Sequence, residues 1–298
     1  MNEAAAQVVL LVRAVEGADP AGKALTKDDR GYAARAAAEL VRWQAADQGG
    51  RATEEAFIVK RAELLAARLA ERSPNIHRAL GAMRWRPWIG IALPVLAFAI
   101  GIAAEHIADR RHVNILAFPL LGLVVWNIAV YVALIVRGAT NLASRSRREP
   151  GWIESRLAGA RGALADRAAG PLSGALAGFA FAWAQHSAPL VAARAARILH
   201  VSAAMLAIGA VAGLYVRGMA FEYRAGWEST FLDANSVHAI LTFFLQPAAW
   251  LTGQPLPSAG GIAALRWGGN GTGENAARWI HLYTATVMLS VVIPRLVL

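Results

Sequence analysis

The sequence predicts an all-α, polytopic integral membrane protein with four transmembrane helices. Two observations lead to this fold class, an apolar composition and four long apolar stretches. The chain has 298 residues, 56% of them hydrophobic, and its mean hydropathy of +0.39 exceeds that of an ordinary soluble domain. The apolar stretches run over Trp88–Ala104, Val113–Val136, Ile198–Val216 and Trp279–Leu298. Each approaches or exceeds the length of about 20 residues at which a helix crosses a hydrocarbon core.

The charges between these stretches predict how the chain is oriented. Residues 1–87 contain 14 Lys and Arg against 11 Asp and Glu, and residues 137–197 contain nine Arg against three acids. Residues 217–275 contain three Arg against four acids, and the link over residues 105–112 is balanced. Loops rich in Lys and Arg stay in the cytoplasm. We therefore expect the N-terminus and residues 137–197 to be cytoplasmic and the other two segments to lie outside.

The first segment, residues 1–87, is predicted to be a helical cytoplasmic region. Its alanine content favours helix, and one helix is expected over about Lys27–Gln44. A second helix is expected to begin at Thr53, because two Glu residues follow it and acids are favourable at the positive end of a helix. This helix should end near Arg72, ahead of a Ser-Pro pair.

The first two spans, over residues 88–136, contain Pro94 and Pro119, and a proline can kink a helix. Three polar residues are candidate intramembrane groups. Asn127 lies in the middle of the second span, and His200 and His281 lie just inside the third and the fourth. Asn127 needs a partner on another helix or water and is expected to hold helices together, and either histidine is a candidate proton relay.

Residues 137–197 are predicted to be an arginine-rich cytoplasmic helical insertion rather than a simple loop. A helix is expected over residues 152–168, followed by an apolar stretch over residues 171–185 that suits an interfacial or partly buried helix. Another helix should restart at residues 187–189 and continue into the third span. Five arginines are candidates for contact with anionic lipid or with a partner: Arg145, Arg147, Arg148, Arg194 and Arg197.

The last segment, residues 198–298, holds spans three and four with the outer segment 217–275 between them. The third span carries a Gly-x-x-x-Gly motif at Gly209 and Gly213, which allows a second helix to approach closely, and the same spacing occurs at 174–178. Arg295 is expected to extend toward the inner face. Because the chain stops inside an apolar run, we expect a further C-terminal part.

The outer segment concentrates charge where the third span leaves the membrane. Candidates for a charged vestibule or an ion-interacting site are Glu222, Arg224, Glu228 and Asp233. The alternative is a set of ion pairs that only fixes the loop. A short apolar helix is expected over Asn235–Leu245, ended by Pro247, and the stretch 235–251 suits a re-entrant or interfacial helix. Trp and Tyr residues near the outer ends of spans three and four are expected to anchor the chain at the interface: Tyr215, Trp227, Trp279 and Tyr283.

The sequence carries no motif of enzymatic chemistry. It contains no G-x-x-x-x-G-K-[ST], no H-E-x-x-H and no G-x-S-x-G. It has no cysteine, which excludes disulfides and thiolate metal sites. We expect no catalytic residue, no cofactor and no metal. The net charge of +10 is not accompanied by a nucleic-acid-binding motif, so nucleic acid is not an expected partner.

Three runs of sequence carry a family resemblance: F-E-Y-R-A-G-W-E-S-T over Phe221–Thr230, the run Asn114–Val124, and W-I-H-L-Y over Trp279–Tyr283. With them, the chain resembles over nearly its whole length a proteobacterial membrane-protein family catalogued as domain of unknown function 2868. The resemblance implies a multi-pass protein of the bacterial inner (plasma) membrane. Members are often encoded beside a predicted GTPase, so it also implies a cytoplasmic GTPase as a partner. The family supplies no established activity.

The leading functional hypothesis is a non-enzymatic inner-membrane channel or pore-like assembly, coupled to a cytoplasmic partner. Four spans with few intramembrane charges are too little for most self-contained transporters, so homo-oligomers in the lipid bilayer would build the pathway. The second hypothesis is a non-conducting membrane anchor or scaffold that recruits the partner through residues 1–87 and 137–197. A membrane enzyme with an outer-face site among the charges of the outer segment is the third.

Overall fold

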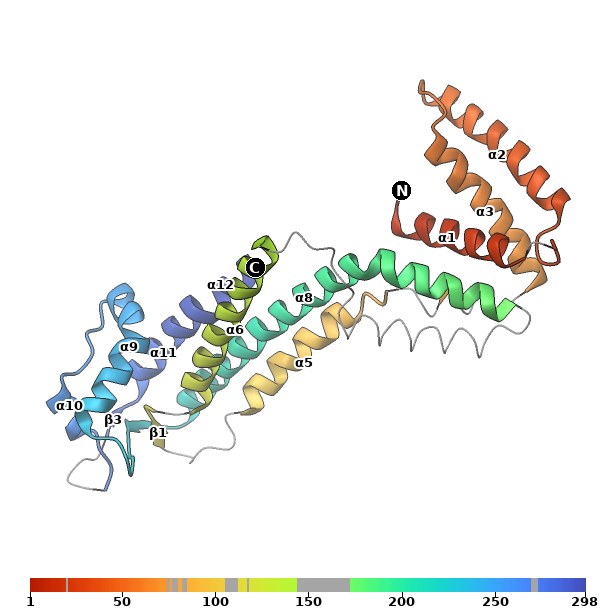
Figure 1. Cartoon of the computed structure of the whole chain (residues 1–298). Coiled ribbons are helices and arrows are strands. Elements are labelled where there is room, and N and C mark those ends of the chain that lie inside the picture. The colour runs from red at the N-terminus through yellow and green to blue at the C-terminus, as the bar shows by residue number, and fades with distance from the viewer. Residues whose placement is uncertain are drawn as a thin grey trace. The chain divides into compact units, whose positions relative to one another are not determined.

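The chain folds into two compact units of helices (Figure 1). The computed structural model describes residues 1–19, 21–73, 76, 80–81, 85–104, 112–116, 118–143, 172–268 and 273–298. The first unit is Met1–Trp85 with Arg147–Ala192, and the second is Arg86–Ser146 with Ala193–Leu298. The described part is mostly helical, as the sequence predicts. The helix expected over residues 152–168 lies outside the described residues, as do three of the candidate arginines, Arg145, Arg147 and Arg148.

In the first unit, side-chain caps begin three helices. These are α1 (Glu3–Ala18), α2 (Lys27–Asp47) and α3 (Glu54–Arg72). Thr53 accepts a hydrogen bond from the Ala56 amide, and Thr26 forms a reciprocal capping box with Asp29. Each cap satisfies an amide that has no partner inside the helix. The predicted start of α3 at Thr53 and its end at Arg72 are confirmed, whereas α1 was not anticipated.

The fourth helix of the first unit comes from much later in the chain. Helix α8 (Ser173–Ala220) contributes Leu176, Phe179 and Trp183 to a core that also holds Leu11 and Leu65. The stretch 171–185 was expected to suit an interfacial or partly buried helix, and the described residues 172–185 are partly buried in this core.

The expected restart of the helix at residues 187–189 is wrong. Helix α8 continues through Pro189 without a break. A proline inside a helix removes one backbone hydrogen bond and crowds one carbonyl, while its fixed φ stays compatible with the helix. Packing on both sides of Pro189 outweighs this local cost.

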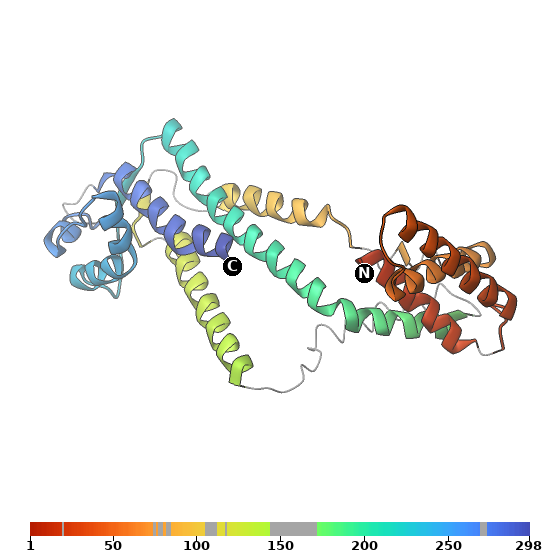
Figure 2. The ribbon, with the colours of Figure 1, turned by 90° about the horizontal axis from the view of Figure 1, so that it is seen from above.

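The second unit is a bundle built from α5 (Ile89–Ala104), α6 (Phe118–Ala143), the later part of α8, and the C-terminal helical stretch. That stretch consists of α11 (Ala277–Val287), a π-helical turn (Met288–Val292) and α12 (Ile293–Val297). Figures 1 and 2 show α5 lying beside α8. Pro119 is only the second residue of α6, where its missing N–H has no helical acceptor, so the proline costs this helix no backbone hydrogen bond. Pro94 does lie inside α5.

Two helices of the described residues are long and apolar enough to cross a membrane, Ser173–Ala220 and Ala277–Val297. Ile89–Ala104 and Leu121–Val136 are shorter apolar helices. Length and composition thus support membrane association of the chain through two helices, while the sequence predicts four spans.

A small sheet joins the ends of the bundle helices, which a purely helical prediction does not include. Its strand order is β1–β2–β3, with β1 (His112–Asn114) parallel to β2 (Arg224–Gly226) and β3 (Glu274–Asn275) antiparallel to β2. In the register, Val113 pairs with Ala225, and Ala225 pairs with Glu274. Each strand is at most three residues long, so the sheet depends on pairing between distant segments and gives little local pattern to read.

Two further helices lie at this sheet end of the bundle, α9 (Ala234–Thr252) and α10 (Ala259–Ala264). The expectation that Pro247 ends the first of them is wrong, because α9 continues to Thr252. Gly253 ends it with a positive φ of 66°, the left-handed conformation that glycine adopts at helix C-termini.

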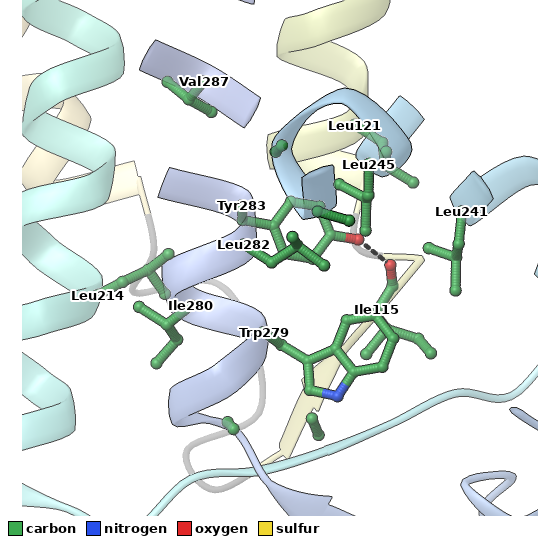
Figure 3. Packing of buried hydrophobic residues seen from close by; sticks show 14 of the residues in the cluster. Ile115, Leu121, Leu214, Leu241, Leu245, Trp279, Ile280, Leu282, Tyr283 and Val287 are labelled. Atoms are coloured by element: carbon green, nitrogen blue, oxygen red, sulfur yellow. Dashed lines mark hydrogen bonds between the residues drawn. The ribbon is translucent and has the colours of Figure 1, made fainter. Parts of the chain in front are cut away.

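Three of the four aromatic residues expected at the membrane interface instead belong to the core of the sheet end, where Figure 3 shows Trp279 and Tyr283. Trp227, Trp279 and Tyr283 are buried. Their polar atoms donate inside the fold, Trp227 Nε1 to the Ile262 carbonyl at 2.6 Å and Tyr283 to the Ile115 carbonyl. The polar atom of a buried indole or phenol that has an acceptor inside the fold does not need water. These rings therefore lie in the core rather than at the membrane interface.

Glycines set the separation of α5 and α8. A Cβ added at Gly209 would overlap the Phe98 carbonyl oxygen, and one added at Gly101 would overlap the Leu206 carbonyl oxygen. The close approach predicted from the Gly209 and Gly213 spacing is therefore confirmed. At Gly178, in the other motif of the same spacing, an added Cβ would meet nothing within 4 Å.

Gly209→Ala is expected to destabilise the bundle by about 1–3 kcal/mol, because a methyl group that meets backbone forces two helices apart. Gly178→Ala, in the same helix, is the matched control. It should be neutral or slightly stabilising, because alanine is the better helix former and has open space there. Thermal unfolding in detergent micelles measures both, and equal melting temperatures for the two variants would contradict the close contact.

The stability of the first turn of α2 is expected to depend on pH through the carboxylate of Asp29. Asp29 accepts hydrogen bonds from the Thr26 hydroxyl at 2.7 Å and from Arg72 Nη1 at 2.7 Å, and these interactions lower its pKa to about 2. A carboxyl pKa below its unfolded value of about 4 stabilises the fold above that value, and the contribution is lost as the pH falls toward 2.

Asp29→Asn is accordingly expected to weaken protection of the first turn of α2 at pH 7 and to change little at pH 2. Hydrogen exchange of α2 peptides in the full chain, corrected for intrinsic rates, measures the protection. Asp28→Asn is the control, because Asp28 precedes Asp29 in the same first turn. An equal loss of protection in both variants would show that helix-terminus charge, rather than the bonds of Asp29, is responsible.

Candidate functional site, a buried arginine among three helices

The most unusual polar group in the second unit is the side chain of Arg295 on α12. It is 7% exposed, although it lies in the C-terminal apolar stretch. Its Nε donates a hydrogen bond to Oδ1 of Asn127 on α6 at 2.8 Å, and its Nη1 donates to Nδ1 of His200 on α8 at 3.1 Å. The guanidinium also lies over the ring of Tyr131, 5.4 Å from its centroid. We call these four residues the Arg295 cluster.

Helix α6 orients two members of the cluster. Asn127 is 3% exposed and donates its amide N–H to the Leu123 carbonyl one turn earlier at 2.8 Å, which leaves its Oδ1 to accept from Arg295. Tyr131 follows four residues later, on the same face of the helix. The i and i+4 spacing thus presents an acceptor and an aromatic ring to one cation.

The irregular turn before α12 completes the cluster. Residues 288–292 form a π-helical turn, a rare element that leaves carbonyls without their usual helical donor. The Tyr131 hydroxyl donates to the Ser290 carbonyl at 3.1 Å. The same tyrosine therefore holds the irregular turn with its hydroxyl and contacts the guanidinium with its ring.

The hydrogen bond to Arg295 assigns the tautomer of His200. A guanidinium can only donate, so Nδ1 of His200 must accept, and the ring is neutral with its proton on Nε2. Protonating Nδ1 would remove this bond and place two cations side by side.

The charge of Arg295 has no acidic partner among the residues that the structure describes. Its bonds there go to two neutral acceptors, which use two of its five N–H groups. In the first unit, by contrast, Arg61 pairs with Glu16 and Arg72 pairs with Asp29. A buried cation balanced only by neutral dipoles is costly, and such groups inside apolar helices mark functional sites by default.

Two of the three candidate intramembrane residues therefore meet at one point. Arg295 joins Asn127 and His200 through hydrogen bonds. The expectation that its side chain extends toward the cytoplasmic membrane face is wrong, because the guanidinium is buried between the helices that carry these two acceptors. His281 lies elsewhere, with its Nδ1 2.6 Å from the Tyr215 hydroxyl.

Two of the four candidate vestibule residues form hydrogen bonds with backbone groups. Arg224 donates to the Gly273 carbonyl at 2.7 Å, and Asp233 caps α9 by accepting from the Ser236 amide at 2.8 Å. Hydrogen bonds from Ser236 lower the pKa of Asp233. Glu222 and Glu228 are exposed. Among the described residues, no group of three or more His, Asp or Glu side chains is arranged to hold a metal ion.

The remaining candidate arginines of the described residues lie on α8. Arg197 is exposed and Arg194 is half-buried, and their contact with lipid or a partner stays a prediction. Sequence reasoning missed Arg295 and Tyr131 as members of a site. The available signals were an arginine inside an apolar run and the four-residue spacing of Asn127 and Tyr131.

A family model matches the C-terminal part of the chain. Residues 161–298 match the model of a family described as "Protein of unknown function (DUF2868)". The match confirms the family resemblance over this part, which includes α8, the sheet-end helices and the C-terminal helical stretch with Arg295. No curated protein and no solved structure matches the chain.

The Arg295 cluster predicts a strong coupling between two substitutions. Asn127→Leu removes the acceptor of Arg295 Nε and should destabilise the fold by about 1–3 kcal/mol, because a buried donor is left unpaired. The double variant Arg295→Leu/Asn127→Leu lacks the donor as well. Its loss of unfolding free energy should therefore be smaller than the sum of the losses in the two single variants. Unfolding in detergent micelles measures the cycle, and additive losses would show that the pair is not coupled.

Proposed function

We propose that this chain, with its DUF2868 segment over residues 161–298, is a four-span inner-membrane protein that assembles into a homo-oligomeric channel for anions, coupled to a cytoplasmic partner. The observation that carries the proposal is the buried guanidinium of Arg295, which has no acidic partner among the described residues. A positive charge fixed in a low-dielectric setting attracts anions and repels cations.

Exposed apolar side chains on α5 and α6 support the two additional spans. Both helices present large aliphatic residues to the surface, and only hydrocarbon or another protein covers such a surface favourably: Ile91, Val95, Leu96 and Ile100 on α5, and Val125, Val132, Ile135 and Val136 on α6. With 26 residues, α6 is about 39 Å long. With 16 residues, α5 is about 24 Å long, which fits a slightly thinned bilayer.

The orientation follows from the charges of the connecting segments. The nine arginines of residues 137–197 favour the cytoplasmic side, and so do the 14 basic residues of residues 1–87. The sheet end of the bundle, with residues 217–275, then faces the periplasm. The oligomer follows from the small number of spans, because four helices per chain enclose a pathway more readily when several copies contribute.

Ion flux through reconstituted protein tests the channel. Purified protein in planar bilayers under a KCl gradient should conduct. Its reversal potential should lie closer to the equilibrium potential of chloride than to that of potassium. Asn127→Asp is the decisive variant, because it places a carboxylate beside Arg295 with almost no change in shape. It should keep the fold, through a charge-assisted bond to Arg295, and lose the preference for chloride.

Asn114→Asp is the matched control, since Asn114 lies at the sheet end of the same unit, where its Oδ1 accepts from the Leu116 amide. It should keep the reversal potential of the wild-type chain. Absence of conductance from the wild type, with cytoplasmic partner and nucleotide present, would overturn the channel. Conductance with no change in Asn127→Asp would remove the Arg295 cluster from the pathway.

A non-conducting scaffold that recruits a cytoplasmic partner, such as a GTPase, is the second candidate. The observation that favours it is the separate hydrophobic core of the first unit, which presents helices α1 to α3 as one folded surface. Co-purification from membranes should then fail after charge removal at exposed residues of this unit, for example Arg13→Ala with Arg35→Ala. Unchanged partner recovery would argue against recruitment through this surface.

A further inference from the structure

Helix α9 is apolar on two opposite faces. One face packs in the core of the second unit and carries Val237, Leu241, Leu245, Ala248 and Ala249. The other face follows the spacing of Ala239, Phe243, Pro247 and Trp250, and these four side chains are exposed. Phe243 is 74% exposed and Trp250 is 77% exposed. We call these four residues the outer face of α9.

The outer face carries no charge. No Asp, Glu, Lys or Arg occurs between Ala234 and Thr252. An ordinary surface helix of a soluble protein places charged and polar residues opposite its buried face. An uncharged apolar face that is exposed in the isolated chain is covered by another protein or by a membrane.

The packing of α9 fixes its level along the bundle. Leu241 and Leu245 lie beside the first turns of α11, in the same cluster as Trp279 and Tyr283 (Figure 3). Trp279 is only the third residue of α11. Since α11 begins the C-terminal helical stretch that is long enough to span, α9 lies at one end of that span rather than at its middle. The end of a span coincides with the boundary between acyl chains and headgroups.

The residue types of the outer face fit that boundary. Phenylalanine and tryptophan have large apolar rings, and the indole N–H of Trp250 needs a wet partner, which headgroups and water supply. The surface is also chemically continuous with the exposed aliphatic residues of α5 and α6 in the same unit. A lipid surface would cover the exposed apolar residues of α5, α6 and α9 together. A protein partner bound to α9 would cover only that helix and leave those of α5 and α6 exposed.

We propose that α9 is an interfacial membrane helix whose outer face inserts among the headgroups and upper acyl chains of the leaflet at the sheet end. The inference rests on the membrane placement in the proposed function and goes beyond it by assigning a lipid contact to a helix that does not span. In an oligomer, such a helix would hold the sheet end of each copy at a constant depth.

Site-directed spin labelling tests the depth directly, because the chain has no cysteine and any single cysteine introduced is the only one. Phe243→Cys and Trp250→Cys report on the outer face. Val132→Cys reports on an exposed position of α6, and Trp43→Cys reports on an exposed position of α2 in the first unit. Collision of each nitroxide with oxygen and with a water-soluble nickel chelate is measured in phosphatidylglycerol and phosphatidylethanolamine vesicles.

The ratio of oxygen to nickel collisions should be several-fold higher at positions 243 and 250 than at position 43, and higher still at position 132. Water-like ratios at 243 and 250, with a membrane-like ratio at 132, would overturn the interfacial helix and leave the spans intact. Immobile labels at 243 and 250 that collide with neither reagent would show a protein on this face and would overturn the lipid contact. A water-like ratio at position 132 would overturn the membrane placement of α6 and the inference with it.

Discussion

The need to satisfy one buried guanidinium constrains how three helices of the second unit meet. Arg295 requires acceptors that water does not supply, and Asn127 and His200 provide them from α6 and α8. Successive residues of a helix differ by about 100° in direction, so a shift of α12 by one residue would turn the guanidinium away from both acceptors. The π-helical turn just before α12, which Tyr131 holds through the Ser290 carbonyl, sets this direction.

The other contacts of the bundle act by shape rather than by charge. Glycines at 101, 209 and 213 let the backbones of α5 and α8 approach closely, and the short sheet ties the loops that follow α5, α8 and α10. Trp227, Trp279 and Tyr283 are buried in one hydrophobic core with residues of α8, α9 and α11. The acids and arginines of the first unit form ion pairs at or near its surface, where each pair contributes little. Arg295 differs from these pairs because it is buried and its hydrogen bonds within the described part of the chain go to neutral acceptors.

The success of the sequence-based predictions depended on how local the decisive interactions were. The start of α3 at Thr53 was readable because a cap involves residues three positions apart. The helix restart expected at residues 187–189 and the helix end expected at Pro247 were both wrong, because a proline removes one hydrogen bond while tertiary packing on either side holds the helix. The role expected for Trp227 was wrong for a related reason, since its indole donates to the Ile262 carbonyl, 35 positions away along the chain.

The sequence by itself determined a mostly helical chain with helices apolar enough for a membrane, the caps of α2 and α3, and the glycine spacing that permits close packing. These properties follow from composition and from periods of three to four residues. Only the tertiary structure decided the three-stranded sheet, the union of α8 with the N-terminal helices, and the Arg295 cluster. The hydrogen bonds of Arg295 join residues 168 and 95 positions apart, and no local pattern encodes which polar groups will meet across such separations.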